Sequence, residues 1–334
     1  MSNLKRILVN KNVCKSAWFM RQAGRYLPEF RKIRKQNQNF IELCLNSKLS
    51  AEITLQPIKR FDIDSAIIFS DILLVPHALG QKVNFIKDMG PKLEAFNHQT
   101  FINNNENSFT QKLQPVYDAI RNTREKLNKN KSLIAFIGAP WTLLVYMLDA
   151  KSSKNEIDYK KIESKSFQIG PILDKLIKFL YIHIENQINS GADVIQIFDS
   201  WAGLIKEENF NDYCIIPNLK LVDFCKKKNI PVICFPKGIG KKYKKFNEAV
   251  NSDGLNIDYE LDPGWARTNL KNVVIQGGLD PKALLEPEER MLQKATRYIQ
   301  TFKDIPYIFN LGHGLLPETD PDKVEKLIKY YRNF

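Results

Sequence analysis

The sequence has few of the features that hold together a secreted protein or carry a chain across a membrane. Five cysteines occur in 334 residues, and no two of them form a Cys-x-x-Cys pair. An odd number without such pairs argues against a disulfide framework and a structural zinc site, and favours a reducing compartment. No uncharged apolar run of about 18 residues could span a bilayer, and residues 1–12 lack the apolar stretch of a secretory signal. We therefore expect a soluble, cytoplasmic protein.

Glycine and proline are also too scarce for a low-complexity linker, with 15 and 16 residues. The sequence is 43% hydrophobic and 26% charged, which excludes a disordered protein, a collagen-like repeat and a coiled-coil rod. A length of 334 residues lies between one large domain and two ordinary ones. Either arrangement could bury a sizeable core.

Acidic residues are outnumbered by basic ones, and the formal net charge is +13 at pH 7. A positive excess suits a nucleic acid, an anionic lipid or a polyanionic small substrate. Lysine, however, clusters with asparagine, as at 128–131 and 226–229, which is typical of an AT-rich gene. No DNA- or RNA-binding motif accompanies the charge. Compositional bias is therefore the first explanation, and we expect no nucleic-acid partner.

Short apolar segments rich in β-branched residues recur along the chain, and each ends in a polar or glycine-rich cluster. Their apolar residues are continuous rather than alternating, which is typical of strands buried on both faces of a parallel sheet. Seven such segments are clear: Ser65–Phe69, Leu133–Ile137, Val194–Phe198, Pro231–Phe235, Leu255–Tyr259, Val273–Gln276 and Tyr307–Asn310. Between them lie segments with helical periodicity, the clearest being Ile172–Ile188, Glu207–Cys225, Glu288–Phe302 and Pro321–Tyr331.

A strand followed by a helix, repeated seven times, predicts an α/β fold. A doubly wound sheet would need a glycine-rich phosphate loop after its first strand, and Phe69–Ile72 is not one. A (β/α)8 barrel needs about 250 residues, which leaves room for an N-terminal extension and a polar insertion at 82–109. We expect a single barrel domain over residues 1–334, with an eighth strand that the sequence does not locate. Residues 1–60 are expected to form an arm and helices that contribute to the site.

In such a barrel, functional residues gather where the strands end at their carboxyl termini. Each expected strand end combines small residues with one polar or charged group. These ends are Ser70-Asp71, Gly138-Ala139-Pro140, Asp199-Ser200, Lys237-Gly238, 277–280 and Gly312-His313-Gly314. One glycine or aspartate there is an ordinary turn residue, but the recurrence at successive strand ends indicates a ligand site.

The segment Trp18–Pro28 has a different pattern. Arg21 and Arg25 flank a small Gln-Ala-Gly turn, with apolar residues on both sides. Guanidinium groups fixed there would bind carboxylates bidentately, although an exposed turn with solvated arginines fits the same pattern. Arg31 and Arg34 follow on an expected helix, where a solvated helix face is the simpler interpretation.

Together these segments resemble the uroporphyrinogen decarboxylase family. The resemblance rests on Trp18–Arg34, Phe69–Gly80, Gly138–Met147, Gln196–Gly203, Phe235–Gly238 and Phe309–Pro317. They run in the family's order over nearly the whole chain, and RQAGRYLPE and FDSWAG are long and unusual. The resemblance implies a (β/α)8 barrel, a homodimer, no cofactor or metal, and no membrane partner. It also implies removal of CO2 from the four acetate side chains of uroporphyrinogen III to give coproporphyrinogen III in heme synthesis.

The resemblance also implies roles for individual residues. Asp71 would be the central carboxylate, which accepts hydrogen bonds from the four pyrrole N–H groups and stabilises positive charge on the ring. Arg21 and Arg25 would hold substrate carboxylates and take part in catalysis. The other substrate-binding positions are the loop residues Gln22, Ala23 and Gly24, the hydrogen-bond donors Tyr146 and Ser200, the carboxylate contacts His313 and Arg34, and the apolar wall residue Phe198. Taken singly, Tyr146 fits a core tyrosine and His313 a histidine satisfied within its turn.

The implied reaction needs no metal or prosthetic group because a pyrrole can itself act as the electron sink. Protonation of a pyrrole α-carbon gives a cationic ring, which draws electrons from the breaking C–CO2 bond, and the resulting methylene is protonated to methyl. The protein has to place a proton donor, remove water and stabilise the cation. Arg21 is our hypothesis for the donor, although arginine, with a pKa above about 12, is an awkward acid.

The chain departs from the family pattern in three loops. Gly278 stands where the family commonly has asparagine, no tryptophan lies near Tyr259, and Thr319-Asp320-Pro321 replaces Thr-Pro-Pro. None of these positions belongs to the expected site, so they affect local loop geometry.

Two alternatives share the expected fold: an enzyme with another activity and a protein without activity. A corrinoid-linked methyltransferase resembles this family in architecture and binds zinc through a His-x-Cys pair and a distant cysteine, but none of the four histidines has a cysteine two residues later. The second alternative is a catalytically inactive relative. The presence of Arg21, Arg25, Asp71 and His313 argues against it, because these are the residues of the expected site.

Overall fold

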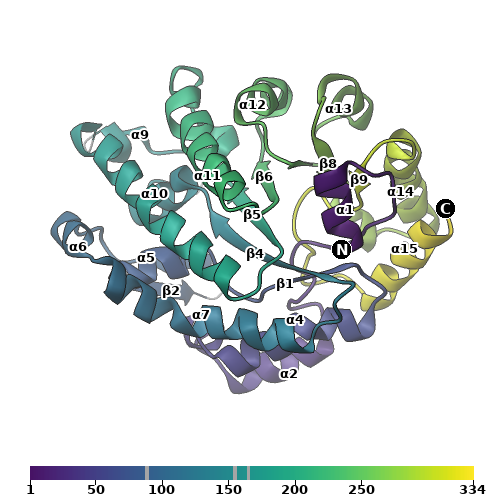
Figure 1. Cartoon of the computed structure of the whole chain (residues 1–334), viewed down its shortest axis with the longest axis horizontal. Helices are drawn as coiled ribbons and strands as arrows, with labels where there is room; N and C mark the ends of the chain where they lie inside the picture. The colour runs from purple at the N-terminus through teal and green to yellow at the C-terminus, as the bar shows by residue number, and fades with distance from the viewer. Residues whose placement is uncertain (87–89, 153–155, 164–165) are drawn as a thin grey trace.

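The computed structural model describes residues 1–86, 90–152, 156–163 and 166–334. Seven parallel strands form one curved sheet in the order β1-β4-β5-β6-β7-β8-β9, which lies at the centre of the molecule in Figure 1. Their bounds are β1 Ser65–Ile67, β4 Ser132–Gly138, β5 Val194–Asp199, β6 Val232–Pro236, β7 Gly254–Ile257, β8 Val274–Gly277 and β9 Tyr307–Ile308. All seven expected strands are confirmed, each with its ends displaced by two residues at most.

Helices connect successive strands and lie outside the sheet (Figure 1). After β1 come α5 (Leu74–Ala78), α6 (His98–Asn103) and α7 (Glu106–Lys126), and after β4 come α8 (Pro140–Met147), α9 (Tyr159–Glu163) and α10 (Ser166–Asn189). The later strands are followed in turn by α11 (Ile216–Lys227), α12 (Tyr243–Val250), α13 (Pro263–Asn269), α14 (Glu288–Phe302) and α15 (Pro321–Asn333). This alternation is the (β/α)8-type fold that the sequence predicts. No helix in the described part of the chain is long and apolar enough to cross a membrane.

Two segments differ in detail from the sequence expectation. Residues 207–225 are not one helix, because a 3-10 turn and a π-helical turn (Asn211–Ile215) precede α11. Pro217 has no N–H to donate to the preceding turn, which accounts for the irregular start. The polar insertion at 82–109 is folded: β2 (Val83–Ile86) pairs antiparallel with β3 (Gly90–Leu93), and α6 follows.

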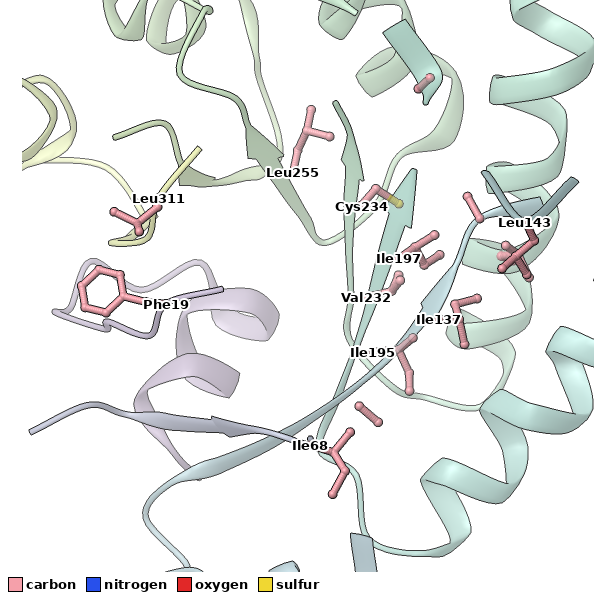
Figure 2. Close-up of a cluster of buried hydrophobic side chains, with 14 of the residues drawn as sticks. Phe19, Ile68, Ile137, Leu143, Ile195, Ile197, Val232, Cys234, Leu255 and Leu311 are labelled. Atoms are coloured by element: carbon pink, nitrogen blue, oxygen red, sulfur yellow. The ribbon is translucent and has the colours of Figure 1, made fainter. Parts of the chain in front are cut away.

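The strands are buried on both faces, which is why their sequences are continuously apolar. On the outer face, Ile137, Ile195 and Ile197 pack with Leu143 of α8 (Figure 2). On the inner face, a second cluster joins strand residues to the helix α1 (Asn3–Asn10) and comprises Leu4, Ile7, Leu8, Trp18, Met20, Ile67, Ile134, Val194, Ile233, Phe235, Val274 and Ile308.

Helix α1 covers the amino-terminal ends of the strands. Its capping residue Ser2 hydrogen-bonds Ser132, the first residue of β4. Leu8 lies so close to Gly254, the first residue of β7, that a Cβ there would be 2.9 Å from Leu8 Cδ2. Because α1 fills this end of the barrel, the carboxyl ends of the strands are the end left for a ligand.

The residues Ser16–Trp18 occupy the gap between β9 and β1. The Phe309 N–H donates to the Ser16 carbonyl at 2.9 Å, and the Trp18 N–H donates to the Phe309 carbonyl at 3.3 Å. On the other side, the Asp64 N–H donates to the Ala17 carbonyl at 2.9 Å, and the Ala17 N–H donates to Asp64 Oδ2 at 2.7 Å. This segment therefore takes the position of the eighth strand that the sequence did not locate.

A layer of buried polar side chains crosses the barrel on the carboxyl-end side of the inner apolar cluster. Gln276 accepts from Trp18 Nε1 at 2.9 Å and donates to Asn256 at 2.8 Å and Gln196 at 3.1 Å. All three amide side chains are fully buried. Because buried amides must find partners, this network fixes the relative positions of β5, β7, β8 and the Ser16–Trp18 segment.

We expect Asp64→Ala to lower the free energy of unfolding by about 2–3 kcal/mol, because it leaves the Ala17 N–H without its acceptor and takes the nearly buried carboxylate away from Arg332. Denaturant titration followed by circular dichroism measures this loss. Asp62→Ala is the matched control: Asp62 also pairs with Arg332, but its side chain is 77% exposed, so we expect a loss below about 1 kcal/mol. Equal losses would show that the closure of the barrel by Ser16–Trp18 does not depend on Asp64.

Candidate active site

Asp71 lies just beyond the carboxyl end of β1, in the turn that leads into α5. Its Oδ1 accepts from the Leu73 N–H at 2.8 Å, and its carbonyl accepts from the Leu74 N–H at 3.2 Å. The other carboxylate oxygen has no hydrogen-bond partner within the described chain. Burial raises the pKa of Asp71 to about 6, while the Leu73 N–H and the Arg21 charge act in the opposite direction. The turn therefore fixes this carboxylate and leaves one oxygen for a ligand.

Arg21 is held beside Asp71 by an unusual backbone conformation. Its φ of 60° lies in the left-handed region, which a residue with a side chain adopts at some cost. Its aliphatic stem lies against Gly314, where a Cβ would be 2.4 Å from Arg21 Cδ. Burial lowers the pKa of Arg21, and the charges of Asp71 and Tyr146 oppose this. The side chain nevertheless reaches solvent, so its stem is fixed against Gly314 while part of the side chain stays accessible at the carboxyl end of the barrel, which we call the cleft.

The Gln-Ala-Gly turn divides into one buried residue and two accessible ones. Gln22 is 1% exposed: its side chain accepts from the Phe19 N–H at 3.0 Å and donates to the Ser65 carbonyl at 2.9 Å. These bonds tie the turn to β1 and hold the arginines on either side of it, and contact of Gln22 with a ligand stays a prediction. Ala23 and Gly24 are partly exposed, and their contact with a ligand stays a prediction.

Tyr146, Ser200 and Phe198 lie on the part of the cleft formed by β4, β5 and α8. Burial and the negative charge of Asp71 raise the pKa of Tyr146 to about 12, so its hydroxyl stays a donor. Ser200 follows β5 directly and is partly exposed. The Phe198 ring lies 5.6 Å from the ring of Phe136, and both are partly exposed, so they form an apolar floor.

The His313 side chain lies in the loop after β9 and is half-buried. Burial and the positive charges of Lys237 and Arg21 lower the pKa of His313 to about 3, so the imidazole is neutral at pH 7. The flanking glycine Gly312 has no room for a side chain, because a Cβ there would lie 2.3 Å from the Tyr259 backbone nitrogen. The loop after β9, which carries His313, therefore packs closely against the loop after β7, and this contact fixes the backbone of the histidine.

Arg25 and Arg34 line a cavity of about 390 Å³ on the α2 side (Pro28–Gln36), together with Phe30, Arg31, Lys35 and Gln38. Arg34 donates to the Asn37 carbonyl and lies 5.8 Å from the centre of the Phe40 ring. Arg31 donates to the carbonyls of Arg25 and Tyr26 at 3.0 and 2.8 Å. This face of α2 is therefore basic and hollowed, and a role for Arg34 in binding stays a prediction.

Sequence reasoning gave no role to two residues that border the cleft. Phe136 is hidden in the apolar run of β4, and nothing in its spacing marks it as part of the floor. Lys237 stands at the end of β6, so its place among the strand ends was the available signal. Asp199, by contrast, is buried and structural, because it accepts from Thr142 at 2.6 Å and Asn218 at 3.2 Å.

The family model and the curated relatives agree on one family. The family model "Uroporphyrinogen decarboxylase (URO-D)" matches residues 7–334. A uroporphyrinogen decarboxylase from Orientia tsutsugamushi (strain Ikeda) is 43% identical over 322 residues, covering 95% of this chain and 94% of the relative. One from Rickettsia felis is 42% identical, covering 94% and 92%. Among solved structures, a methyltransferase from Methanosarcina mazei has a TM-score of 0.75 at 16% identity, covering 99% and 97%, and supports the fold alone.

We expect Asp71→Asn to raise the free energy of unfolding at pH 8 by about 1–2 kcal/mol. Because the folded-state pKa of Asp71 is about 6 and the usual value is 3.8, the folded protein binds the extra proton between these pH values. Asp71 therefore costs stability progressively as the pH rises from about 4 to 6, and the cost is constant above. Denaturant titrations of both proteins from pH 4 to pH 8 measure the difference. The exposed Asp223→Asn serves as control, and a pH-independent difference for Asp71→Asn would contradict the prediction.

Proposed function

The chain belongs to the uroporphyrinogen decarboxylase family, and we propose that its cleft converts uroporphyrinogen III to coproporphyrinogen III with release of four CO2. It is a carboxy-lyase of porphyrin biosynthesis, and its substrate is a small tetrapyrrole. The observation that carries the proposal is the Asp71 carboxylate, which has one oxygen free at the cleft and lies in the electrostatic field of Arg21.

Asp71 is proposed to bind the centre of the substrate. The four pyrrole N–H groups of a porphyrinogen converge toward its middle, and a carboxylate is an acceptor-only group that can receive several of them. As one pyrrole is protonated at its α-carbon, the negative charge of Asp71 stabilises the cation in a site with little water. For this role Asp71 has to be ionised, and neighbouring Arg21 favours that form.

The peripheral carboxylates are proposed to bind the cationic and hydroxyl groups around Asp71. Arg21 and Arg25 offer guanidinium groups whose geometry matches a carboxylate. Tyr146 and Ser200 donate hydroxyl hydrogen bonds, and neutral His313 donates one ring N–H. Arg34 gives a further carboxylate contact from the basic cavity, and Phe198 supports the macrocycle from below, while Ala23 and Gly24 approach it with their backbone.

Arg21 is the proposed proton donor. Proton transfer to the α-carbon makes the pyrrole an electron sink, and the C–CO2 bond breaks to leave an exocyclic methylene. The methylene then takes a proton to become methyl, and the α-carbon loses the proton that it gained, so each CO2 released consumes one proton and the pyrrole is restored. Burial lowers the pKa of Arg21, which makes the guanidinium a stronger acid than in water. The reaction as proposed uses no metal or cofactor, because the substrate ring accepts the electrons itself.

We also propose a compartment, an oligomeric state and a domain organisation for the enzyme. All five cysteines are free thiols, which suits a reducing, cytoplasmic location. A homodimer is proposed from the family, and residues 1–334 as one domain in which residues 1–60 contribute to the cleft through the turn at 21–25.

Anaerobic incubation with uroporphyrinogen III, followed by oxidation and chromatographic separation by carboxylate number, tests the reaction. We expect a ladder of porphyrins from eight to four carboxylates. In Asp71→Asn the rate should fall at least about 100-fold, because the cation loses its counter-charge. Asp223→Asn, remote from the cleft, should turn over normally. Unchanged substrate with folded wild-type protein would refute the proposed reaction.

Arg21→Lys tests the proton donor. We expect kcat to fall about 100-fold and the alkaline limb of kcat against pH to move to lower pH, because an ammonium loses its proton more readily than a guanidinium. Arg25→Lys should mainly raise KM. An Arg21→Lys enzyme with an unaltered pH profile and only a raised KM would assign Arg21 to binding alone.

A further inference from the structure

Lys237 is the first residue after β6 and is held on a rigid turn at the carboxyl end of the barrel. Its N–H donates to the Asp199 carbonyl at 3.1 Å, and its carbonyl accepts from the Gly203 N–H at 2.9 Å. The next residue, Gly238, has a φ of 80° and donates its N–H to the buried Asp258 carboxylate at 2.7 Å. The backbone on both sides of the lysine is therefore fixed by bonds to β5 and to the loop after β7.

The turn leaves no room for an alternative packing. A Cβ on Gly203 would lie 2.4 Å from the Gly238 carbonyl oxygen, and Asp258 is held further by the Tyr243 hydroxyl at 3.1 Å. A rigid backbone limits where a half-buried lysine side chain can reach. Such pre-organisation is typical of a binding residue and unnecessary for a solvated surface lysine.

The Lys237 ammonium has no carboxylate partner within the described residues, whereas Lys242, five positions later, pairs with Glu207 at 3.2 Å. Lys237 instead lies within electrostatic range of a second cation, Lys151, and of the neutral His313 imidazole. Lys151 lies 4.0 Å from the centre of the Trp201 ring. Trp201 in turn is 5.8 Å from the Tyr146 ring. Positive groups gathered without a counter-charge are what an anionic ligand compensates.

Strand order places Lys237 across the cleft from the arginine turn. In the ring formed by the seven strands and the Ser16–Trp18 segment, β6 lies four positions from that segment in either direction. Arg21 and Arg25 follow the segment, so they and Lys237 approach the ligand from opposite sides. The charges of Arg21 and Lys237 both lower the pKa of His313, so both act on the same imidazole.

We propose that Lys237 is a further substrate-binding residue, which holds a peripheral carboxylate of the tetrapyrrole on the side of the cleft opposite Arg21 and Arg25. The inference rests on the proposed function, because it takes the ligand to be a macrocycle with carboxylates around its whole edge. A ligand of that shape cannot be neutralised from one side, and the arginine turn supplies cations on one side alone.

The test compares Lys237→Gln, Lys237→Arg and the matched control Lys241→Gln, which removes an equal charge from an exposed position four residues later. Binding is measured with oxidised uroporphyrin, an unreactive octacarboxylate, by quenching of tryptophan fluorescence, and kcat and KM are measured with uroporphyrinogen III. We expect Lys237→Gln to raise Kd and KM about tenfold with kcat within about twofold. Lys237→Arg should bind within about threefold of wild type, and Lys241→Gln should match wild type.

Wild-type affinity in Lys237→Gln, an equal loss in Lys241→Gln, or a fall in kcat without a change in Kd would overturn the proposal. Near-ultraviolet circular dichroism checks folding, and if Lys237→Gln does not fold, Lys237→Met takes its place under the same criteria. Wild-type protein that binds uroporphyrin through Lys237 but does not decarboxylate would refute the proposed reaction and not the binding residue. Normal turnover with normal binding by Lys237→Gln would refute the binding residue alone.

Discussion

Closure of the barrel between β9 and β1 is the constraint on which the site depends. The seven strands leave one gap, and the backbone of Ser16–Trp18 fills it by hydrogen bonds to Phe309 on one side and Asp64 on the other. The chain that closes the gap continues directly into the arginine turn, which Gln22 fastens to the start of β1. The same bonds that complete the barrel therefore set where Arg21 stands relative to Asp71.

The cleft concentrates charges that the protein does not neutralise internally. Arg21 acts on the Asp71 carboxylate, and the charges of Arg21 and Lys237 both act on neutral His313. Burial penalises the ionised forms of both Asp71 and Arg21, and Arg21 adopts a strained backbone besides. The packing of the barrel around the site offsets the free-energy cost of these buried charges and of the strained backbone. A bound polyanion with inward N–H donors would reduce this cost.

Most of the barrel could be predicted because its strands are buried on two faces, which leaves a continuous apolar signal such as Val194–Phe198. The eighth position could not, because Ser16–Trp18 forms a single β-bridge, Ala17 to Phe309, and the short apolar run Ala17–Met20 has no β-branched residue. The break before α11 also escaped periodicity, since a proline within an amphipathic stretch left the pattern intact. In the site, strand ends pointed to Asp71, Ser200 and His313, whereas the floor residue Phe136 looked like any other core residue.

The sequence by itself determined the fold class, the family and the types of group in the cleft, because apolar runs, strand-end polar residues and RQAGRYLPE are local patterns. Only the tertiary structure decided which groups face each other. The Gln22 side chain is bonded inside the barrel wall, Asp199 is an internal acceptor, and Lys237, on the strand opposite the arginine turn, has no carboxylate partner among the residues that the structure describes. Those distinctions depend on contacts between residues far apart in the chain, and burial and charge at such contacts have no signature in local sequence.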